Sequence, residues 1–369
     1  MTLDLRYTEE QEALRDSVRA MLTDRAPWAR VLKVAESPEP DDADLWRLLS
    51  AETGLAALAV PEHLGGAGAT LAETAVVLEE LGRAVAPVPY LGTAVAGQLL
   101  LHLGDGELLR DLAGGEVVAL ALPFDVGPAA SGLRLPGVEV STAADGSPLL
   151  NGTVSSVADA LRARVLLVPA GGALFAVEAD AAGLTRTPVA SLDETRPLCD
   201  LSMWNAPARL LAAGDRAAAG LDAALVAGAA LLASEQLGLA QWCLDTTVEY
   251  LKTRFQFGRP VGSFQALKHR LADLWVELVQ ARAVARHAAA AVAVGDPDAR
   301  LAAALAQAHC GPVAVRAAEE CVQMHGGIGF TWEHPAHLYL KRAKSAAVAY
   351  GTAAHHRAAL ATLADLVPA

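Results

Sequence analysis

The sequence predicts a mainly helical α+β fold in which helices come first, a β-domain follows, and a helical bundle ends the chain. Apolar residues recur at helical spacing towards both ends. Between them, short apolar runs alternate with Gly, Pro, Asp and Asn, which is typical of strands and turns. The 369 residues suffice for two or three domains. We therefore expect an N-terminal α-helical domain at 1–115, a middle antiparallel β-domain at 116–215 and a C-terminal helical bundle domain at 216–369.

The two outer segments carry clear helix signals. Thr8-Glu-Glu-Gln11 is a capping box, because its hydroxyl and its Gln side chain can satisfy free N–H groups at a helix start. In the last segment, the turn Gly295-Asp-Pro-Asp298 separates two long helical patterns. The strands of the middle segment are expected at five short apolar runs: 117–122, 132–135, 149–152, 165–168 and 173–177.

The turn at residues 254–265 joins two long helices of the last segment. Gly258 and Pro260 can stop the first helix, and Ser263 is expected to cap the second. The turn is rich in cationic, amide and aromatic side chains: Arg254, Gln256, Phe257, Arg259, Phe264, Gln265 and Lys268. Such a surface suits a nucleotide that bears a pyrophosphate. A solvated interhelical turn is the alternative.

Composition limits the partners of the chain. The formal net charge of −13 argues against nucleic acid and anionic membranes, because phosphate binding needs a basic surface. No apolar run has the length of a membrane span, and the acidic start does not resemble a signal peptide. The four cysteines lack Cys-x-x-Cys spacing, so we expect reduced packing residues in a cytoplasmic protein and no metal site.

With these segments in view, the chain resembles an acyl-CoA dehydrogenase over nearly its whole length. Four motifs carry the resemblance: Val60-Pro-Glu-His-Leu-Gly-Gly-Ala-Gly68, Leu78-Glu-Glu-Leu-Gly-Arg83, Arg254-x-Gln-Phe-Gly-Arg-Pro-x-Gly-Ser-Phe-Gln265 and Gln323-x-His-Gly-Gly-Ile-Gly-Phe-Thr-Trp-Glu-His334. The last two are highly specific together. The resemblance implies an N-terminal helical domain, a middle β-domain and a C-terminal four-helix domain, which is the order read above.

The resemblance also implies FAD bound at a subunit interface, where one subunit surrounds the flavin ring and its neighbour holds the phosphates and adenosine. The positions of this chain that match the neighbour's contribution are Arg254, Gln256, Phe257, Gln265, Gln323, Gly326, Gly327 and Thr352. The residue types agree, because Arg forms charge-assisted hydrogen bonds to phosphate and Gly lets backbone approach a ligand.

The chain departs from the family at the catalytic base. The family's carboxylate commonly precedes the Gly-Thr of a Tyr-Glu-Gly-Thr turn, but here Tyr350 precedes Gly351-Thr352. An unperturbed phenol titrates near ~10, which is too high for efficient C–H deprotonation at neutral pH. The alternative base position of some members falls at or near Gly228, and the nearest carboxylate is Glu235.

Two further features of the family are missing. The helix stretch that resembles the CoA-binding one, Val226-Ala-Gly-Ala229, is apolar and lacks the usual Asp and Arg. The segments that resemble the flavin wall read Ala121-Leu-Pro-Phe-Asp-Val-Gly127 and Ser156-Val-Ala158 instead of the family's Thr-Glu-Pro, Gly-Ser-Asp and Trp-Ile-Thr.

Together these departures favour the non-catalytic subunit of a heteromeric, steroid side-chain type acyl-CoA dehydrogenase. We expect a homologous partner subunit that carries the catalytic Glu, an acyl-CoA substrate and an electron-transfer flavoprotein as acceptor. Two alternatives stay open. One is a self-sufficient homomeric enzyme that uses Tyr350, Glu235 or an unrecognised base, and the other is an FAD-free binding or scaffold protein on this fold.

Overall fold

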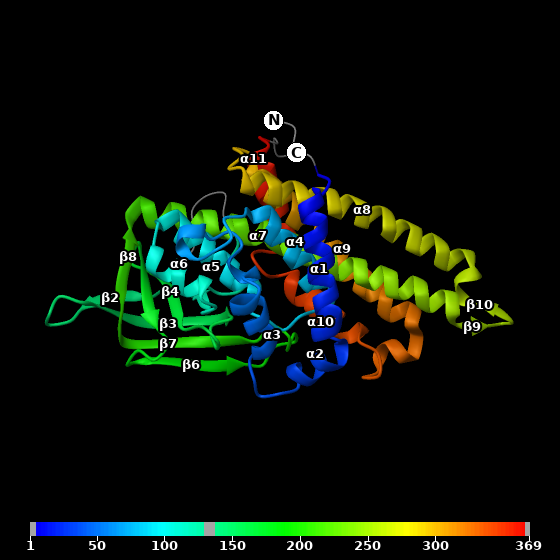
Figure 1. Cartoon of the computed structure of the whole chain (residues 1–369), viewed down its shortest axis with the longest axis horizontal. Coiled ribbons are helices and arrows are strands. Elements are labelled where there is room, and N and C mark those ends of the chain that lie inside the picture. Colours follow the sequence, from blue (N-terminus) through cyan, green and yellow to red (C-terminus); the bar gives the residue numbers. More distant parts are fainter. Residues whose placement is uncertain (1–4, 129–136, 366–369) are drawn as a thin grey trace.

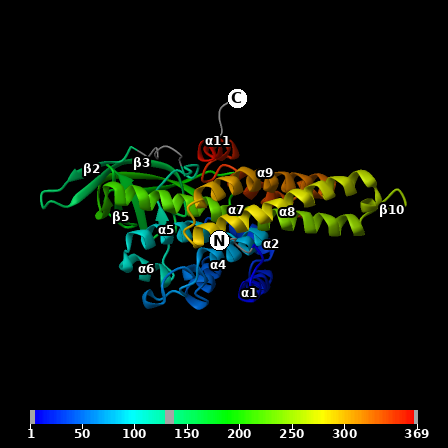
Figure 2. The same cartoon turned by 90° about the horizontal axis from the view of Figure 1, so that it is seen from above.

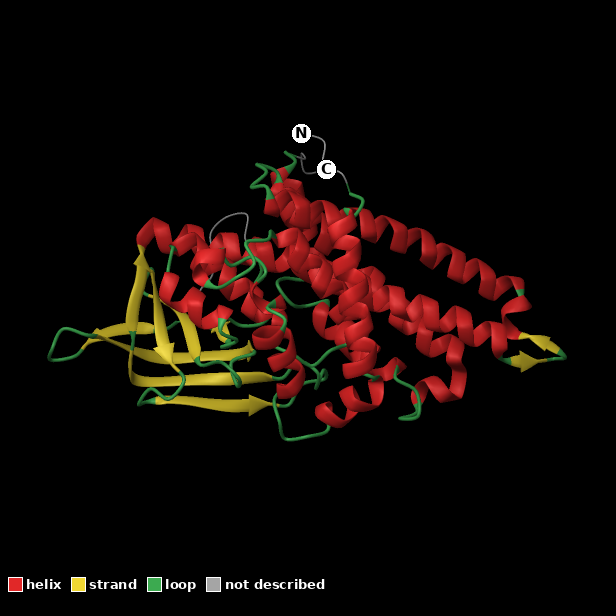
Figure 3. Cartoon of the chain, in the orientation of Figure 1, coloured by secondary structure: helices red, strands yellow, loops and turns green. Residues whose placement is uncertain are grey.

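The computed structural model describes residues 5–128 and 137–365, and it has the expected order of helices, β-domain and helices (Figure 1). The larger strands gather at one end of an elongated molecule, and a small hairpin lies at the opposite end (Figure 3). The predicted order of helical, β and helical segments is therefore confirmed. The strand expected at 132–135 lies outside the described residues.

The first part of the chain is helical, as expected. Its helices are α1 (Glu9–Arg25), α2 (Trp28–Ala35), α3 (Ala43–Arg47), α4 (Leu71–Ala84), α5 (Tyr90–Leu103) and α6 (Gly106–Ala113). A π-helical turn and two 3₁₀ turns lie at Leu48–Glu52, Leu55–Ala57 and Glu62–Leu64. The capping box is confirmed, because the Gln11 backbone N–H donates to Thr8 Oγ1 and the Thr8 N–H donates to Gln11 Oε1, each at 3.2 Å.

The middle segment forms two four-stranded sheets, with strand orders β1-β4-β5-β8 and β2-β3-β7-β6. The strands are β1 (Val118–Leu120), β2 (Glu139–Thr142), β3 (Pro148–Ala158), β4 (Val165–Ala170), β5 (Ala173–Glu178), β6 (Leu184–Val189), β7 (Leu198–Pro207) and β8 (Arg209–Ala213). One detail differs from the expectation. β1 pairs with β4 in parallel, with Val118 opposite Val165, whereas the other pairs in these sheets are antiparallel.

The last segment is built around long helices that run side by side (Figure 2). The helices are α7 (Gly214–Thr253), α8 (Gln265–Ala293), α9 (Ala299–His325), α10 (Ala336–Ala346) and α11 (Ala353–Leu363). The most apolar stretch of α7 is long enough to cross a membrane, but 78% of it is buried inside the protein. Its apolar character therefore fits a helix at the centre of the bundle.

The turn between α7 and α8 is a small hairpin of β9 (Phe255–Gln256) and β10 (Arg259–Pro260), followed by a 3₁₀ turn at Val261–Ser263. The expected cap at Ser263 is wrong. Phe264 is the N-cap residue of α8, and no side chain caps this helix. The reason is that Ser263 already belongs to the 3₁₀ turn, where its buried Oγ has no hydrogen-bond partner among the described residues.

Candidate functional site

The hairpin end of the helical domain carries the first group of predicted site residues. Arg254 is the C-cap residue of α7, and Gln265 is the first residue of α8. The backbone of Arg254 is fixed, because its carbonyl accepts a 2.8 Å bond from the Val261 N–H. Its exposed guanidinium forms no ion pair or hydrogen bond with another described side chain. The cation is therefore free to meet a ligand or a partner.

The turn at the end of α9 lies beside this group. The Tyr250 hydroxyl donates to the His325 carbonyl at 3.4 Å, and the two rings stack at 4.4 Å, which ties the turn to the last part of α7. Gly326 has φ 62° and ψ −137°, a backbone region that residues with a side chain avoid. No other atom lies within 4 Å of a Cβ built at Gly326 or Gly327, so the backbone is open to an approaching group. The structure thus brings Arg254 and the turn of Gln323 to one end of the molecule.

Thr352 and Phe257 have different surroundings. Thr352 is the N-cap residue of α11, and its hydroxyl accepts the His355 backbone N–H at 3.2 Å. Figures 1 and 2 both separate α11 from the β9–β10 hairpin. That Thr352 contacts the same cofactor as the residues around Arg254 stays a prediction. Phe257 lies at the hairpin tip, where 90% of its side chain is exposed.

The position that the sequence motif matches to the family's base holds a partly buried ring, that of Tyr350. Tyr350 has a left-handed backbone (φ 51°), and its N–H donates to the Phe124 carbonyl at 3.0 Å. Its ring packs on Gly228, where an added Cβ would lie 2.7 Å from Tyr350 Cε1. The two base positions considered from the sequence, Tyr350 and Gly228, are therefore in contact. The Tyr350 ring fills the volume that a side chain at position 228 would need. Burial, with a smaller contribution from Asp159, raises the pKa of the Tyr350 phenol well above its ordinary value.

Little space remains around Tyr350. The cavity at this position measures about 30 Å³ and is lined by Gly92, Leu120, Leu122, Pro123, Phe124, Val126, Ala158, Leu225 and Tyr350. This volume has room for roughly one or two water molecules, whereas ligand pockets commonly measure about 300–1,000 Å³. The loop that resembles the flavin wall closes it from one side, because a Cβ at Gly127 would lie 2.2 Å from the Tyr350 carbonyl oxygen.

Glu235, the alternative base, belongs to a buried ion-pair network. Its carboxylate is 2.5 Å from Arg196 and 3.2 Å from Arg342, and the residue is 3% exposed. Burial opposes ionisation, but the two guanidinium groups outweigh it and hold the pKa of Glu235 below its ordinary value. A carboxylate stabilised in this way is a poor proton acceptor, and here it joins α7 to α10 and to the segment before β7.

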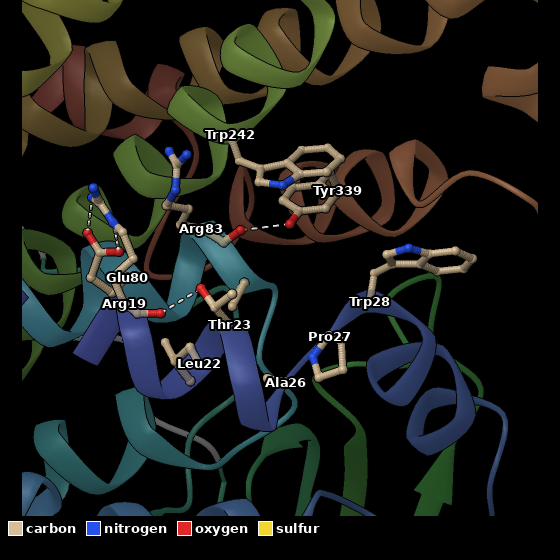
Figure 4. Close-up of a pocket in the computed structure, with 11 residues that line it drawn as sticks. Arg19, Leu22, Thr23, Ala26, Pro27, Trp28, Glu80, Arg83, Trp242 and Tyr339 are labelled. Atoms are coloured by element: carbon tan, nitrogen blue, oxygen red, sulfur yellow. Dashed lines mark hydrogen bonds and ion pairs between the residues drawn. The ribbon is translucent and has the colours of Figure 1, made fainter. Parts of the chain in front are cut away.

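Two larger cavities lie outside the predicted residues. One of about 490 Å³ adjoins the hairpin and is lined by Val248, Leu251, Lys252, Pro260, Gly262, Lys268 and Leu271. The other, of about 300 Å³, lies among α1, α2, α4, α7 and α10 (Figure 4). In it Trp242 stacks on Tyr339 at 3.6 Å, and Arg19 pairs with Glu80. Sequence reasoning missed both cavities. The walls of the second come from segments far apart in the chain. The walls of the first lie within residues 248–271, and their shape depends on how α7, the hairpin and α8 pack together.

Comparison with known proteins identifies the class. The family models "Acyl-CoA dehydrogenase, N-terminal domain" and "Acyl-CoA dehydrogenase, C-terminal domain" match residues 8–113 and 221–363. The chain is also 38% identical to acyl-CoA dehydrogenase IpdE2 of Mycolicibacterium smegmatis over 93% of this chain and 95% of that protein. The chain therefore belongs to the acyl-CoA dehydrogenase family.

Solved structures of the same fold include a steroid acyl-CoA dehydrogenase. A variant of the steroid enzyme Tcur3481–Tcur3483 superposes with a TM-score of 0.85 at 32% identity, covering 97% of this chain and 98% of that chain. The ChsE4–ChsE5 complex from Mycobacterium tuberculosis gives a TM-score of 0.86 at 27% identity, with both chains fully covered. Butyryl-CoA dehydrogenase of Megasphaera elsdenii, at 22% identity, shares the fold with a TM-score of 0.85.

Proposed function

We propose that this chain is the non-catalytic subunit of a heteromeric, FAD-dependent acyl-CoA dehydrogenase. The observation that carries the proposal is the small cavity of about 30 Å³ around Tyr350, at the position where the family has its base. A chain without that space and without a carboxylate there has no evident means of desaturating an acyl-CoA alone. The exposed residues around Arg254 would instead contact the cofactor of another subunit.

The two halves of FAD fit this chain differently. The unpaired Arg254 guanidinium and the open backbone at Gly326 and Gly327 suit the pyrophosphate. Gln256, Gln265 and Gln323 are exposed amides on the same end and can add hydrogen bonds. The cavity beside Tyr350 does not suit the flavin ring. When bound, FAD supplies the hydride acceptor for desaturation, and this chain would hold its phosphate half.

The partner that the proposal requires is a homologous subunit with the carboxylate base and a complete flavin wall. It would bind the acyl-CoA and pass electrons to an electron-transfer flavoprotein. Two relatives by structure, Tcur3481–Tcur3483 and ChsE4–ChsE5, are named as pairs of chains. Their likeness to this chain supports a heteromeric assembly here.

The test is flavin content. The chain is purified alone and after co-expression with a homologous chain that carries the missing Glu, and flavin absorbance is measured per chain. We expect almost no flavin in the isolated chain and one flavin per pair of unlike chains in the complex. An isolated chain that is fully loaded with flavin and oxidises an acyl-CoA would contradict the proposal and favour a homomeric enzyme.

A further inference from the structure

Two cysteines meet in the core of the helical bundle. Cys243 lies on α7 and Cys321 on α9, and both side chains are 0% exposed. Their thiols are hydrogen-bonded to each other, although the residues are 78 positions apart in the chain. Both cysteines are free in this structure. The pair arises only from the packing of α7 on α9, so no local Cys-x-x-Cys spacing indicates it.

Polar groups surround the sulfur of Cys321. His325 lies one turn further along α9, and its Nδ1 is 2.7 Å from the Cys321 carbonyl oxygen and 3.7 Å from the Cys321 sulfur. The Thr247 hydroxyl, which donates to the Cys243 carbonyl at 2.6 Å, also lies within hydrogen-bonding reach of this sulfur. The imidazole is held in place, because it stacks on Tyr250 at 4.4 Å. Cys321 is therefore surrounded by groups that can stabilise a thiolate.

These surroundings distinguish Cys321 from the other thiols. The hydrogen bond from Cys243 is the largest of several interactions that outweigh burial and lower the pKa of the Cys321 thiol. Burial instead raises the pKa of Cys243, Cys199 and Cys310. Cys310 lies on the same helix as Cys321, but its thiol donates to the Ala281 carbonyl at 3.5 Å, which favours the neutral form. All four side chains are at most 1% exposed, so exposure does not explain the contrast.

A cavity lies beside the pair. The cavity of about 300 Å³ shown in Figure 4 is lined by Trp242, the residue before Cys243, and by Tyr339. Burial is the main cause that raises the pKa of the Tyr339 phenol, and the Cys243 sulfur is the next, which places this ring close to the pair. A molecule as small as hydrogen peroxide fits the cavity, and a local opening beside the Tyr339 ring would let it reach the sulfurs.

A metal site is the alternative use of clustered cysteine and histidine side chains. A structural zinc ion needs four such ligands around one point. Residues 5–128 and 137–365 contain no group of three or more His, Cys, Asp or Glu side chains that could hold a metal ion. A thiolate beside a second thiol instead suits oxidation of the two sulfurs to a disulfide.

We propose that Cys243 and Cys321 form a peroxide-sensitive dithiol, in which Cys321 is oxidised first and Cys243 then completes a disulfide. The Cys321 thiolate attacks one peroxide oxygen, so an S–O bond forms, the O–O bond breaks, and the hydroxide that leaves takes up a proton. The Cys243 sulfur then attacks the sulfenic acid, an S–S bond forms, and the oxygen leaves with the Cys243 proton as water. Two thiols and one peroxide thus give one disulfide and two waters.

The disulfide would join the last part of α9 to α7, four residues before His325 ends the helix. This modification site is independent of the proposed function, because it needs neither FAD nor a partner subunit.

The test is thiol mapping of the folded wild-type chain after brief treatment with hydrogen peroxide. The remaining thiols are alkylated in denaturant, and the chain is digested without reductant and analysed by mass spectrometry. We expect one linked pair of peptides, which contain Cys243 and Cys321, and dithiothreitol should separate them. We expect these two thiols to be lost at least about tenfold faster than those of Cys199 and Cys310, which are equally buried.

Three single substitutions separate the two roles. Cys310→Ala is the matched control on α9, and it should form the link as the wild type does. Cys243→Ala removes the second thiol, so no link should form and dimedone should trap Cys321 as a sulfenic acid. Cys321→Ala should leave Cys243 as slow to react as Cys310, because burial raises the pKa of both thiols.

Two results would overturn the proposal. One is the loss of all four thiols at a common slow rate, which would show that unfolding of the chain limits the reaction. The other is oxidation of Cys321 in the wild type without a link to Cys243. Both results are read from the wild-type chain, so they decide the matter even if a variant fails to fold.

Discussion

The sequence motif matches Tyr350 to the family's carboxylate, and the surroundings of Tyr350 argue against the same role. The phenol is packed against Gly228, and burial raises its pKa well above the ordinary value. Phenolate would therefore be scarce near neutral pH. In this chain the Tyr350 ring fills the space beside Gly228. The hydrogen bond from its backbone N–H to the Phe124 carbonyl holds the loop around Phe124 in place.

This role leads to a prediction for the complex with the partner subunit. Tyr350→Phe removes only a hydroxyl that makes no hydrogen bond to another described residue, so turnover at saturating acyl-CoA should stay within about twofold of wild type. If Tyr350 were the base, the change would cost the contribution of general-base catalysis, typically about a hundredfold or more. A fall of that size with unchanged flavin content would favour the alternative of a self-sufficient homomeric enzyme.

A second prediction concerns two neighbouring aspartates with opposite surroundings. Asp41 is 7% exposed, and neither carboxylate oxygen accepts a hydrogen bond from a described residue. Burial raises its pKa to about 6, although Arg162 lies 3.7 Å away. In Asp42, hydrogen bonds from Arg30 outweigh burial and lower the pKa.

The signs follow from linkage. Because the folded pKa of Asp41 is raised, the folded state binds more protons than the unfolded state between about pH 4 and pH 6, and stability falls as pH rises through that window. Asp41→Asn should therefore stabilise the protein above pH 6 by about 1–3 kcal/mol and have little effect near pH 4.

Asp42→Asn should destabilise the protein at neutral pH, and this effect should disappear as acid protonates the wild-type carboxylate. Calorimetric Tm values across this pH range check both, and a Tm decrease for Asp41→Asn at pH 7 would contradict the first.

At the scale of single residues, the sequence predicted the positions of Arg254 and Gln323 at helix ends better than the packing around Tyr350. Arg254 and Gln323 belong to local motifs, so their positions at helix ends could be read from nearby Gly and Pro. The contact of Tyr350 with Gly228 joins residues 122 positions apart, and no local pattern indicates it. The role of Glu235 was hidden for the same reason, because its partners Arg196 and Arg342 come from other elements.

At the scale of elements, α4 and α7 touch backbone to backbone. A Cβ at Gly238 of α7 would lie 1.7 Å from the Glu79 carbonyl oxygen, and one at Gly82 of α4 would lie 2.1 Å from the Glu235 carbonyl oxygen. Two glycines, one on each helix, therefore permit the close approach. This contact sets the position of α7, the helix that carries Gly228 and ends at Arg254.

Gly238→Ala should separate these helices. Alanine gains about 1 kcal/mol of helix propensity over glycine, but an atom 1.7 Å from a backbone oxygen forces the backbone to move. We expect the clash to prevail and to lower stability by about 1–3 kcal/mol, measured as a lower calorimetric Tm. Gly311→Ala is the matched control in a neighbouring bundle helix. Its nearest atom, Gln236 Nε2, lies 3.6 Å away, so stability should be kept or slightly raised. An equal loss in both variants would contradict the contact argument.

The elements that sequence patterns missed are those with mixed polarity. The strands expected at 165–168 and 173–177 were continuous apolar runs, and both exist as β4 and β5. β7 alternates buried residues such as Leu201 and Met203 with exposed ones, so it lacks such a run. β6 has no buried residue in its pattern and is specified by pairing with β7. Pairing between strands is a tertiary property, which also explains why the parallel contact of β1 with β4 could not be foreseen.

At the scale of the whole molecule, charge is distributed unevenly along the long axis. The chain is acidic overall, with 42 acidic and 29 basic side chains, whereas residues 250–272 include five basic side chains and no acidic one. Two of the five are paired with acids from outside this stretch, Lys252 with Glu249 and Arg270 with Glu320. An acidic protein repels an anionic cofactor at long range, and salt screens this repulsion beyond about 10 Å. The proposed binding of FAD phosphates would therefore depend on nearby cations. Among these, Arg254 forms no ion pair with a described residue.

Arg254→Ala tests that dependence in the assembled complex. Loss of a charge-assisted interaction of about 1.5–3 kcal/mol should weaken FAD binding about ten- to a hundredfold, measured as the dissociation constant of the flavin. The fold should survive, because the guanidinium is exposed and the backbone bond to Val261 remains. Arg357→Ala is the control, since this exposed arginine lies on α11 and its loss changes the net charge equally, from −13 to −14.

If both variants lose FAD alike, long-range charge governs binding. If neither does, Arg254 does not face the pyrophosphate. A loss confined to Arg254→Ala supports a direct contact, and high salt should then narrow the difference from wild type, because screening weakens the contact.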